Sequence, residues 1–270
     1  LPEDVTVIGI GPRKLPGVPL AATSIEEMAA QYVHRLRERQ PVGPYMLGGL
    51  CAGGLIAYEI ASQLSQAGET VDLVAIFDAG TPQSPTRSTL MSNQRKRSFA
   101  ASIAGLRQRP GGAMMRGWLF ASMALGAVYR ALSWEVCSRI RAFTGGSRVV
   151  LLSQLLKRNR PWPGWLRSPN FRDIYRYAEQ RYKPAPVEGV RVVLIRAKTL
   201  NAVSSSEADR GIDDTPYAEY YVDELMGWGV LVSDLKAIDV DGGHSSMFWE
   251  PHVHSLARAI RPLFAPSSTD

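Results

Sequence analysis

The sequence predicts an α/β protein with a mainly parallel sheet flanked by helices. Short apolar runs alternate with segments of helical periodicity, the pattern of strands joined by crossover helices. A glycine-containing turn at residues 49–54 separates one apolar run from a helix, as at the strand-to-helix junctions of such sheets. The chain has 270 residues, of which 45% are hydrophobic, so it is long enough to bury one large core.

Five strands are expected, at residues 5–10, 45–47, 71–77, 190–195 and 235–240. The first helix should begin after Ser24, because Ser24 and Glu27 form a capping box, and it should stop before Pro41. A second helix leaves the glycine-containing turn and ends near Gly68, and an amphipathic one follows Pro251. With parallel pairing and right-handed crossovers, the carboxyl ends of these strands meet at one edge.

The turn Gly49-Leu50-Cys51-Ala52-Gly53-Gly54 has the pattern of a nucleophile elbow with cysteine at its apex. Such a turn strains the central residue and requires small residues two positions to either side, here Gly49 and Gly53. It would lift Cys51 above the sheet and place the Ala52 amide at a helix N-terminus, facing an oxyanion. The same pattern also fits an ordinary glycine-rich turn around a buried, inert cysteine.

Two polar residues follow later strands. Asp78 comes directly after the apolar run at 71–77, and His244 lies in a glycine-bearing loop after the run at 235–240. Asp78 alone could cap the following turn, and His244 alone could bond to local backbone. Together with Cys51 they give the order nucleophile, acid, histidine, which is that of the α/β-hydrolase arrangement. The other histidines are expected at the surface: His34, His252 and His254.

These positions lie in stretches that resemble the type I thioesterase domains that end polyketide synthase and nonribosomal peptide synthetase assembly lines. The resemblance is carried by residues 48–61 (Gly-Gly-Leu-Cys-Ala-Gly-Gly-Leu-Ile-Ala-Tyr-Glu-Ile-Ala), by Asp78, by residues 225–229 (Leu-Met-Gly-Trp-Gly) and by residues 243–253. It implies an α/β-hydrolase fold with Cys51 as nucleophile, Asp78 as acid and His244 as base. Most members of that family have serine at the elbow.

The resembled family also has strands upstream of the run at 5–10, with a His-Pro-Gly-Gly-like loop that supplies a second oxyanion donor. The sequence contains no such stretch. We therefore expect the N-terminal part of that fold to lie outside this sequence. Only the first oxyanion donor, the Ala52 amide, is assigned.

Residues 85–185 are predicted to be a helical lid inserted between two core segments, 1–84 and 186–270. From 87 to 167 the sequence has 15 Lys and Arg against one acid, Glu135, a local charge of +14 in a chain of +6 overall. The charge fits either solvated lid faces or a docking surface for an acidic carrier protein and its phosphopantetheine arm. No nucleic-acid motif accompanies it, and the apolar run at 118–129 is shorter than the roughly 20 residues of a transmembrane segment.

The resemblance implies a thioesterase that releases a carrier-tethered polyketide or peptide acyl chain, by hydrolysis or cyclisation, through a Cys51 acyl-enzyme. Such chemistry needs no metal or organic cofactor. Two alternatives stay open: a dienelactone-hydrolase-like enzyme for small lactones or esters, which shares the Gly-x-Cys-x-Gly-Gly elbow, and a non-catalytic carrier-binding module. With two cysteines, Cys51 and Cys137, and no secretory signal in the sequence, a cytoplasmic location is expected.

Overall fold

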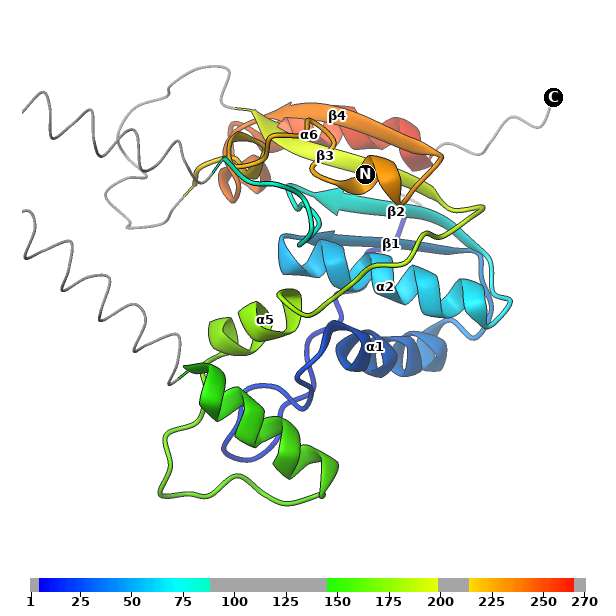
Figure 1. The fold of residues 1–270 in the computed structure, drawn as a ribbon. Coiled ribbons are helices and arrows are strands. Elements are labelled where there is room, and N and C mark those ends of the chain that lie inside the picture. Colours follow the sequence, from blue (N-terminus) through cyan, green and yellow to red (C-terminus); the bar gives the residue numbers. More distant parts are fainter. Residues whose placement is uncertain (1–4, 88–144, 199–213, 265–270) are drawn as a thin grey trace, which may run out of the picture.

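The sheet is parallel and lies between two layers of helices. The computed structural model describes residues 5–87, 145–198 and 214–264. Within them four strands pair in the order β1 (Tyr45–Leu50), β2 (Val71–Phe77), β3 (Arg191–Lys198) and β4 (Leu235–Asp241). Helices α1 (Ile25–Arg39) and α2 (Ala52–Gln66) lie on one side of the sheet and α6 (Val253–Ile260) on the other (Figure 1).

The strands alternate their buried side chains between the two faces. Val74 and Ile76 of β2 pack into the larger core with α1 and α2, while Leu73 packs with Leu256 of α6 in a smaller cluster. Covering both faces in this way is typical of parallel sheets. The predicted fold class, a parallel sheet flanked by helices, is therefore confirmed, and four of the five expected strands are present within two or three residues of their expected ends.

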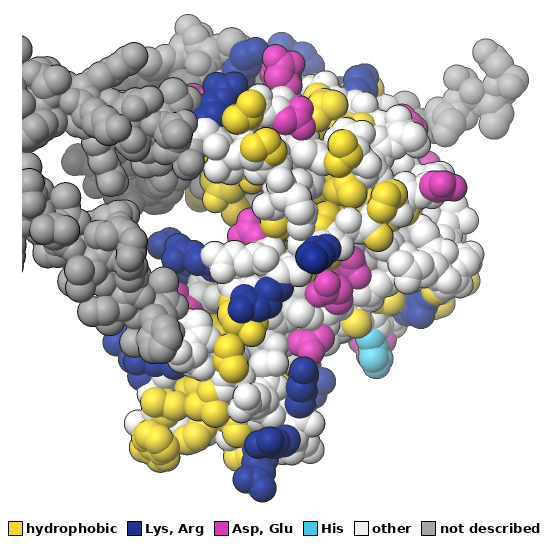
Figure 2. Space-filling model, viewed as in Figure 1, with side chains coloured by type: hydrophobic (Ala, Val, Ile, Leu, Met, Phe, Trp, Pro, Cys, Tyr) yellow, Lys and Arg dark blue, Asp and Glu magenta, His cyan; other side chains and the backbone are white. Residues whose placement is uncertain are grey.

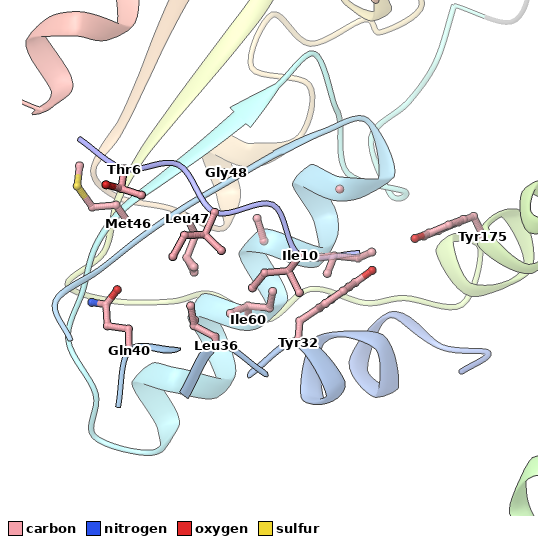
Figure 3. Close-up of a pocket in the computed structure, with 14 residues that line it drawn as sticks. Thr6, Ile10, Tyr32, Leu36, Gln40, Met46, Leu47, Gly48, Ile60 and Tyr175 are labelled. Atoms are coloured by element: carbon pink, nitrogen blue, oxygen red, sulfur yellow. The ribbon is translucent and has the colours of Figure 1, made fainter. Parts of the chain in front are cut away.

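The strand expected at residues 5–10 is wrong. This segment has no regular secondary structure, and the side chains of Val7 and Ile8 are 71% and 57% exposed. Together with residues of α1, α2 and β1, it lines a cavity of about 280 Å³. Ile10, Tyr32, Leu36, Leu47 and Ile60 line it from several sides (Figure 3). Of its apolar side chains, Ile10 packs against the core while Val7 and Ile8 stay exposed, and the segment forms no backbone ladder with β1.

Helix α1 begins as its capping residues predict. The Ser24 hydroxyl accepts a hydrogen bond from the Glu27 amide at 3.1 Å. The Glu27 carboxylate reaches back to the amide of Thr23, at 3.0 Å, one residue earlier than in a standard capping box. The helix ends with Gln40 as its C-cap, before Pro41. Its buried side chains then pack against α2, the helix that carries the elbow.

A loop after β3 is fixed to α2 by an aromatic pair. The buried Trp228 ring packs on Tyr58 with 4.9 Å between centroids, and its indole N–H donates to the Ala79 carbonyl at 2.7 Å. Gly227 before it has φ 86, and a Cβ there would lie 2.2 Å from the Thr81 hydroxyl. These contacts hold residues 214–232 over the carboxyl ends of the strands.

Part of the predicted insertion is described. Residues 145–157 are helical, and α5 (Phe171–Glu179) packs near α1. The rest, 88–144, lies outside the described residues, and with it Glu135, Cys137 and the apolar run at 118–129. The boundaries 1–84, 85–185 and 186–270 and the lid itself therefore stay predictions. No helix in the described ranges is both long and apolar enough to cross a membrane.

Candidate active site

Cys51 stands at a strained turn between β1 and α2. Its backbone has φ 55 and ψ −126, a region that side-chain-bearing residues rarely occupy. The Cys51 amide donates to the Phe77 carbonyl at 3.0 Å, and its own carbonyl accepts from the Gly54 amide at 2.9 Å. The turn is therefore tied both to β2 and to the first turn of α2, as a nucleophile elbow is.

The glycines of the elbow have different roles. A Cβ on Gly49 would lie 2.1 Å from the Gly53 carbonyl oxygen, and one on Gly54 would lie 2.9 Å from the Ile76 side chain. A Cβ on Gly53 would meet nothing within 4 Å. A methyl group on Gly53 would have room, so the crowding at this turn arises at Gly49, where a methyl group would meet the Gly53 backbone. The second position at which a methyl group is crowded is Gly54.

Asp78 is fully buried where β2 ends. Its carboxylate joins three elements: Oδ1 accepts from the Ala197 amide at 3.3 Å, and Oδ2 accepts from the Tyr217 amide at 2.8 Å. The same Oδ2 lies 2.7 Å from Nδ1 of His244. Its hydrogen bonds thus go to the end of β3, to the loop after β3 and to the imidazole.

His244 is 9% exposed and lies just beyond β4. Asp214 holds its loop: the Asp214 carbonyl accepts from the His244 amide at 3.0 Å, and its carboxylate accepts from the amides of Ser245 and Ser246 at 2.6 and 2.9 Å. A Cβ on Gly243 would overlap Asp214. Sequence reasoning missed Asp214, because it lies 30 positions earlier in a stretch with no periodic pattern.

Tyr217 completes the site and was also missed from sequence. Its ring stacks on the His244 imidazole, with 4.0 Å between centroids and 10° between planes. Its hydroxyl oxygen lies 3.5 Å from Sγ of Cys51. The structure therefore brings Cys51, Asp78 and His244 to one place at the carboxyl edge of the sheet, with Tyr217 in contact with each.

The contacts within the site lower the pKa of Cys51 and raise the pKa of His244. Burial raises the pKa of the Cys51 thiol, but the neighbouring His244 imidazole, the Tyr217 hydroxyl and the Ala52 amide together lower it below its ordinary value. Burial lowers the pKa of His244, yet its contacts with Asp78 and Cys51 outweigh that effect and raise it to about 9. Both shifts favour a thiolate beside an imidazolium.

The other histidines lie elsewhere. His34 is exposed on α1, 3.5 Å from Glu38, and His254 is exposed on α6, as expected. His252 is half-buried at the start of α6 and packs near Gly242. Of the four histidines in the sequence, only His244 faces the elbow cysteine.

The comparisons with known proteins agree on one family. A family model described as "Thioesterase domain" matches residues 2–139. The chain is 47% identical over 60 residues to the non-reducing polyketide synthase terA of Aspergillus terreus, and 44% identical over 73 residues to Malpibaldin synthetase of Mortierella alpina. These stretches are 22% and 27% of this chain and 3% and 1% of the relatives, so the chain spans a few per cent of their length.

Two solved structures illustrate the structural likeness. The NocB thioesterase domain in covalent complex with a nocardicin G analog gives a TM-score of 0.42 at 21% identity, covering 89% of this chain and 74% of that one. The surfactin thioesterase domain SrfTE gives 0.45 at 15% identity, covering 90% and 77%.

The elbow leads to a prediction with a matched control. Gly49→Ala should lower the free energy of unfolding by on the order of 2 kcal/mol or more, because its methyl group meets the Gly53 carbonyl. Gly53→Ala should leave stability unchanged or slightly raised, since its methyl group has open space and alanine suits a helix better. Urea unfolding measures both; equal losses in the two variants would contradict this geometry.

Proposed function

The chain belongs to the thioesterase domain family, and from that premise we propose that it releases a polyketide or peptide acyl chain from a carrier protein through an acyl-enzyme on Cys51. The observation that supports this most is the sulfur at the elbow, beside an imidazole that a buried carboxylate holds. The relatives, a polyketide synthase and a synthetase by name, support a carrier-tethered substrate.

In the first half-reaction Cys51 takes the acyl group. Its thiolate attacks the carbonyl carbon of the thioester, and a new C–S bond forms. The Ala52 amide, at the first position of α2, donates to the oxygen that becomes negative. When the bond to the phosphopantetheine sulfur breaks, the His244 imidazolium gives its proton to that leaving thiolate. Acyl-Cys51 and a free carrier thiol result.

In the second half-reaction the acyl group leaves. Water, or a hydroxyl or amine within the acyl chain, attacks the same carbonyl carbon while His244 accepts its proton. The C–S bond to Cys51 breaks, and the thiolate returns to its place beside the new imidazolium. Asp78 keeps Nδ1 of the ring occupied at 2.7 Å, so the other ring nitrogen is the one that exchanges protons. No metal or organic cofactor takes part in these steps.

Sulfur at the elbow changes the energy of the intermediate. A serine would convert the incoming thioester into a less reactive oxoester, whereas Cys51 keeps the acyl group as a thioester. The second step therefore starts from an activated acyl group. We propose that this suits a difficult release, such as closure of a strained ring or attack by a weak nucleophile.

The docking partner we propose is an acidic acyl or peptidyl carrier protein. Residues 145–167 contain five Lys or Arg and no acid. Figure 2 shows Lys and Arg side chains on this face around a group of hydrophobic ones at its lower end. Trp165, within residues 145–167, is 86% exposed. Positive charge around an apolar contact favours an acidic protein partner over a neutral one.

Acylation of Cys51 tests the proposed function. Offered a panel of acyl thioesters on phosphopantetheine or on a carrier protein, the enzyme should gain the mass of the acyl group on the Cys51 peptide and then release an acid or a ring. Cys51→Ala should gain none. Intact mass and product analysis measure both.

Two outcomes would overturn that proposal. Turnover of small lactones with no thioester acylation would favour the dienelactone-hydrolase-like alternative. Tight carrier binding with no acylation by any member of the panel would favour a binding module.

Cys51→Ser tests the role of sulfur. We expect the serine variant to release products more slowly and with a larger share of hydrolysis over cyclisation or amine capture, because its acyl-enzyme is a less reactive oxoester. Release rates and product ratios of the unmodified enzyme and Cys51→Ser, measured side by side on one substrate, test this expectation. The same rate and the same ratio in both enzymes would show that the exchange of oxygen for sulfur has no such effect.

A further inference from the structure

Tyr217 contacts every member of the Cys51, His244 and Asp78 group with a different part of itself. Its backbone amide donates to Asp78 Oδ2, its ring stacks on the imidazole, and its hydroxyl lies 3.5 Å from the sulfur. The proposed function uses Cys51, His244, Asp78 and the Ala52 amide, and not Tyr217. The hydroxyl is therefore a polar group at the reacting atom that the mechanism above leaves without a role.

Local structure fixes where this side chain lies. Tyr217 begins a short 3₁₀ helix, Tyr217–Glu219, directly after Pro216, whose φ is −55. The Tyr220 ring meets the Tyr217 ring edge-on, with 6.0 Å between centroids. The hydrogen bond from the Tyr217 amide to Asp78 holds the backbone, and the ring contacts with His244 and Tyr220 hold the side chain. These contacts keep the Tyr217 hydroxyl beside Sγ of Cys51.

We propose that Tyr217 is a catalytic residue whose hydroxyl donates a hydrogen bond to the Cys51 thiolate and keeps that sulfur ionised before the substrate arrives. The proposal rests on Cys51 being the nucleophile of the proposed function. A thiolate carries no hydrogen, so it can only accept. The hydroxyl must then be the donor. No bond is made or broken by Tyr217 itself.

The hydroxyl keeps its proton while it does this. Burial and the neighbouring Cys51 raise the pKa of Tyr217 well above its ordinary value of 10.0. Tyr217 is thus a neutral donor over the whole range in which the thiol titrates. It stabilises the thiolate without competing with His244 for the proton that moves during catalysis.

Stabilising the thiolate increases its amount near neutral pH but lowers its reactivity as a nucleophile. Each step down in thiol pKa increases the ionised fraction near neutral pH but makes the thiolate a weaker nucleophile, with a Brønsted coefficient of about 0.4–0.5. Removing the hydroxyl should therefore leave less thiolate at neutral pH and a more reactive one at high pH. A mere loss of structure would lower the rate at every pH.

The test uses Tyr217→Phe, which keeps the ring and the backbone amide and removes only the hydroxyl. Tyr220→Phe is the matched control, since it removes a hydroxyl from the neighbouring ring that packs on Tyr217. The rate of alkylation of Cys51 by iodoacetamide is measured against pH, with the Cys51 peptide quantified separately from that of Cys137. Thermal unfolding confirms that each variant is folded.

We expect the midpoint of the Tyr217→Phe profile to rise by about one pH unit, a size within reach of a hydrogen bond to a charged group. The plateau at high pH should rise by about threefold. The Tyr220→Phe profile should match that of the unmodified protein. Because thiol and imidazole titrate together, the midpoint belongs to the pair.

An unchanged midpoint in a folded Tyr217→Phe variant would overturn this proposal, and so would a midpoint that falls. A lower rate at all pH values with no shift would assign Tyr217 a structural role only. The measurement uses no acyl substrate. A shifted midpoint together with failure of the thioester panel would therefore refute the proposed function, and with it the catalytic role, while leaving the hydrogen bond from Tyr217 to the thiolate standing.

Discussion

The site depends on one buried oxygen atom. Oδ2 of Asp78 accepts the Tyr217 amide and faces Nδ1 of His244, at 2.8 and 2.7 Å. Through it the end of β2 fixes both the loop after β3 and the loop after β4, which carry Tyr217 and His244, the two side chains that interact with Cys51. A carboxylate with no exposed surface is costly unless it is fully bonded. The cost is offset here by amide donors and by the imidazole, so the group is stable only when these elements meet as they do.

The sheet, the helix caps and the three residues at strand ends follow from local sequence signals. Strand β2 has its expected ends, and Ser24 caps α1, because apolar runs and capping groups act over a few residues. The strand predicted at 5–10 is absent, because this run packs Ile10 against the core and leaves Val7 and Ile8 exposed instead of pairing with β1. Only the tertiary structure determines this. Asp214 and Tyr217 lie in a stretch without periodicity, and their partners in the site are 27 to 166 positions away. No local pattern could have found them.

Gly49 and Gly54 show that sequence alone also cannot identify which atoms are crowded at a tight turn. The sequence indicates that a tight turn needs small residues, and the structure shows which atoms collide. The clash at Gly49 is with backbone, which cannot move without opening the first turn of α2. Cys51 adopts its positive φ inside this frame. The surrounding hydrogen bonds therefore maintain the strained backbone of Cys51. Its thiol is placed beside the His244 imidazole and the Tyr217 hydroxyl.

The protonation state of His244 tests this picture most directly. An NMR titration of the ring, assigned with His244→Gln, should give an imidazole that stays charged to a pH near 9, because the contacts with Asp78 and Cys51 outweigh the effect of burial. Asp78→Asn should bring that midpoint down, since the carboxylate no longer favours the charged ring. A ring that titrates near 6.5 in the unmodified protein, and does not respond to Asp78→Asn, would contradict it.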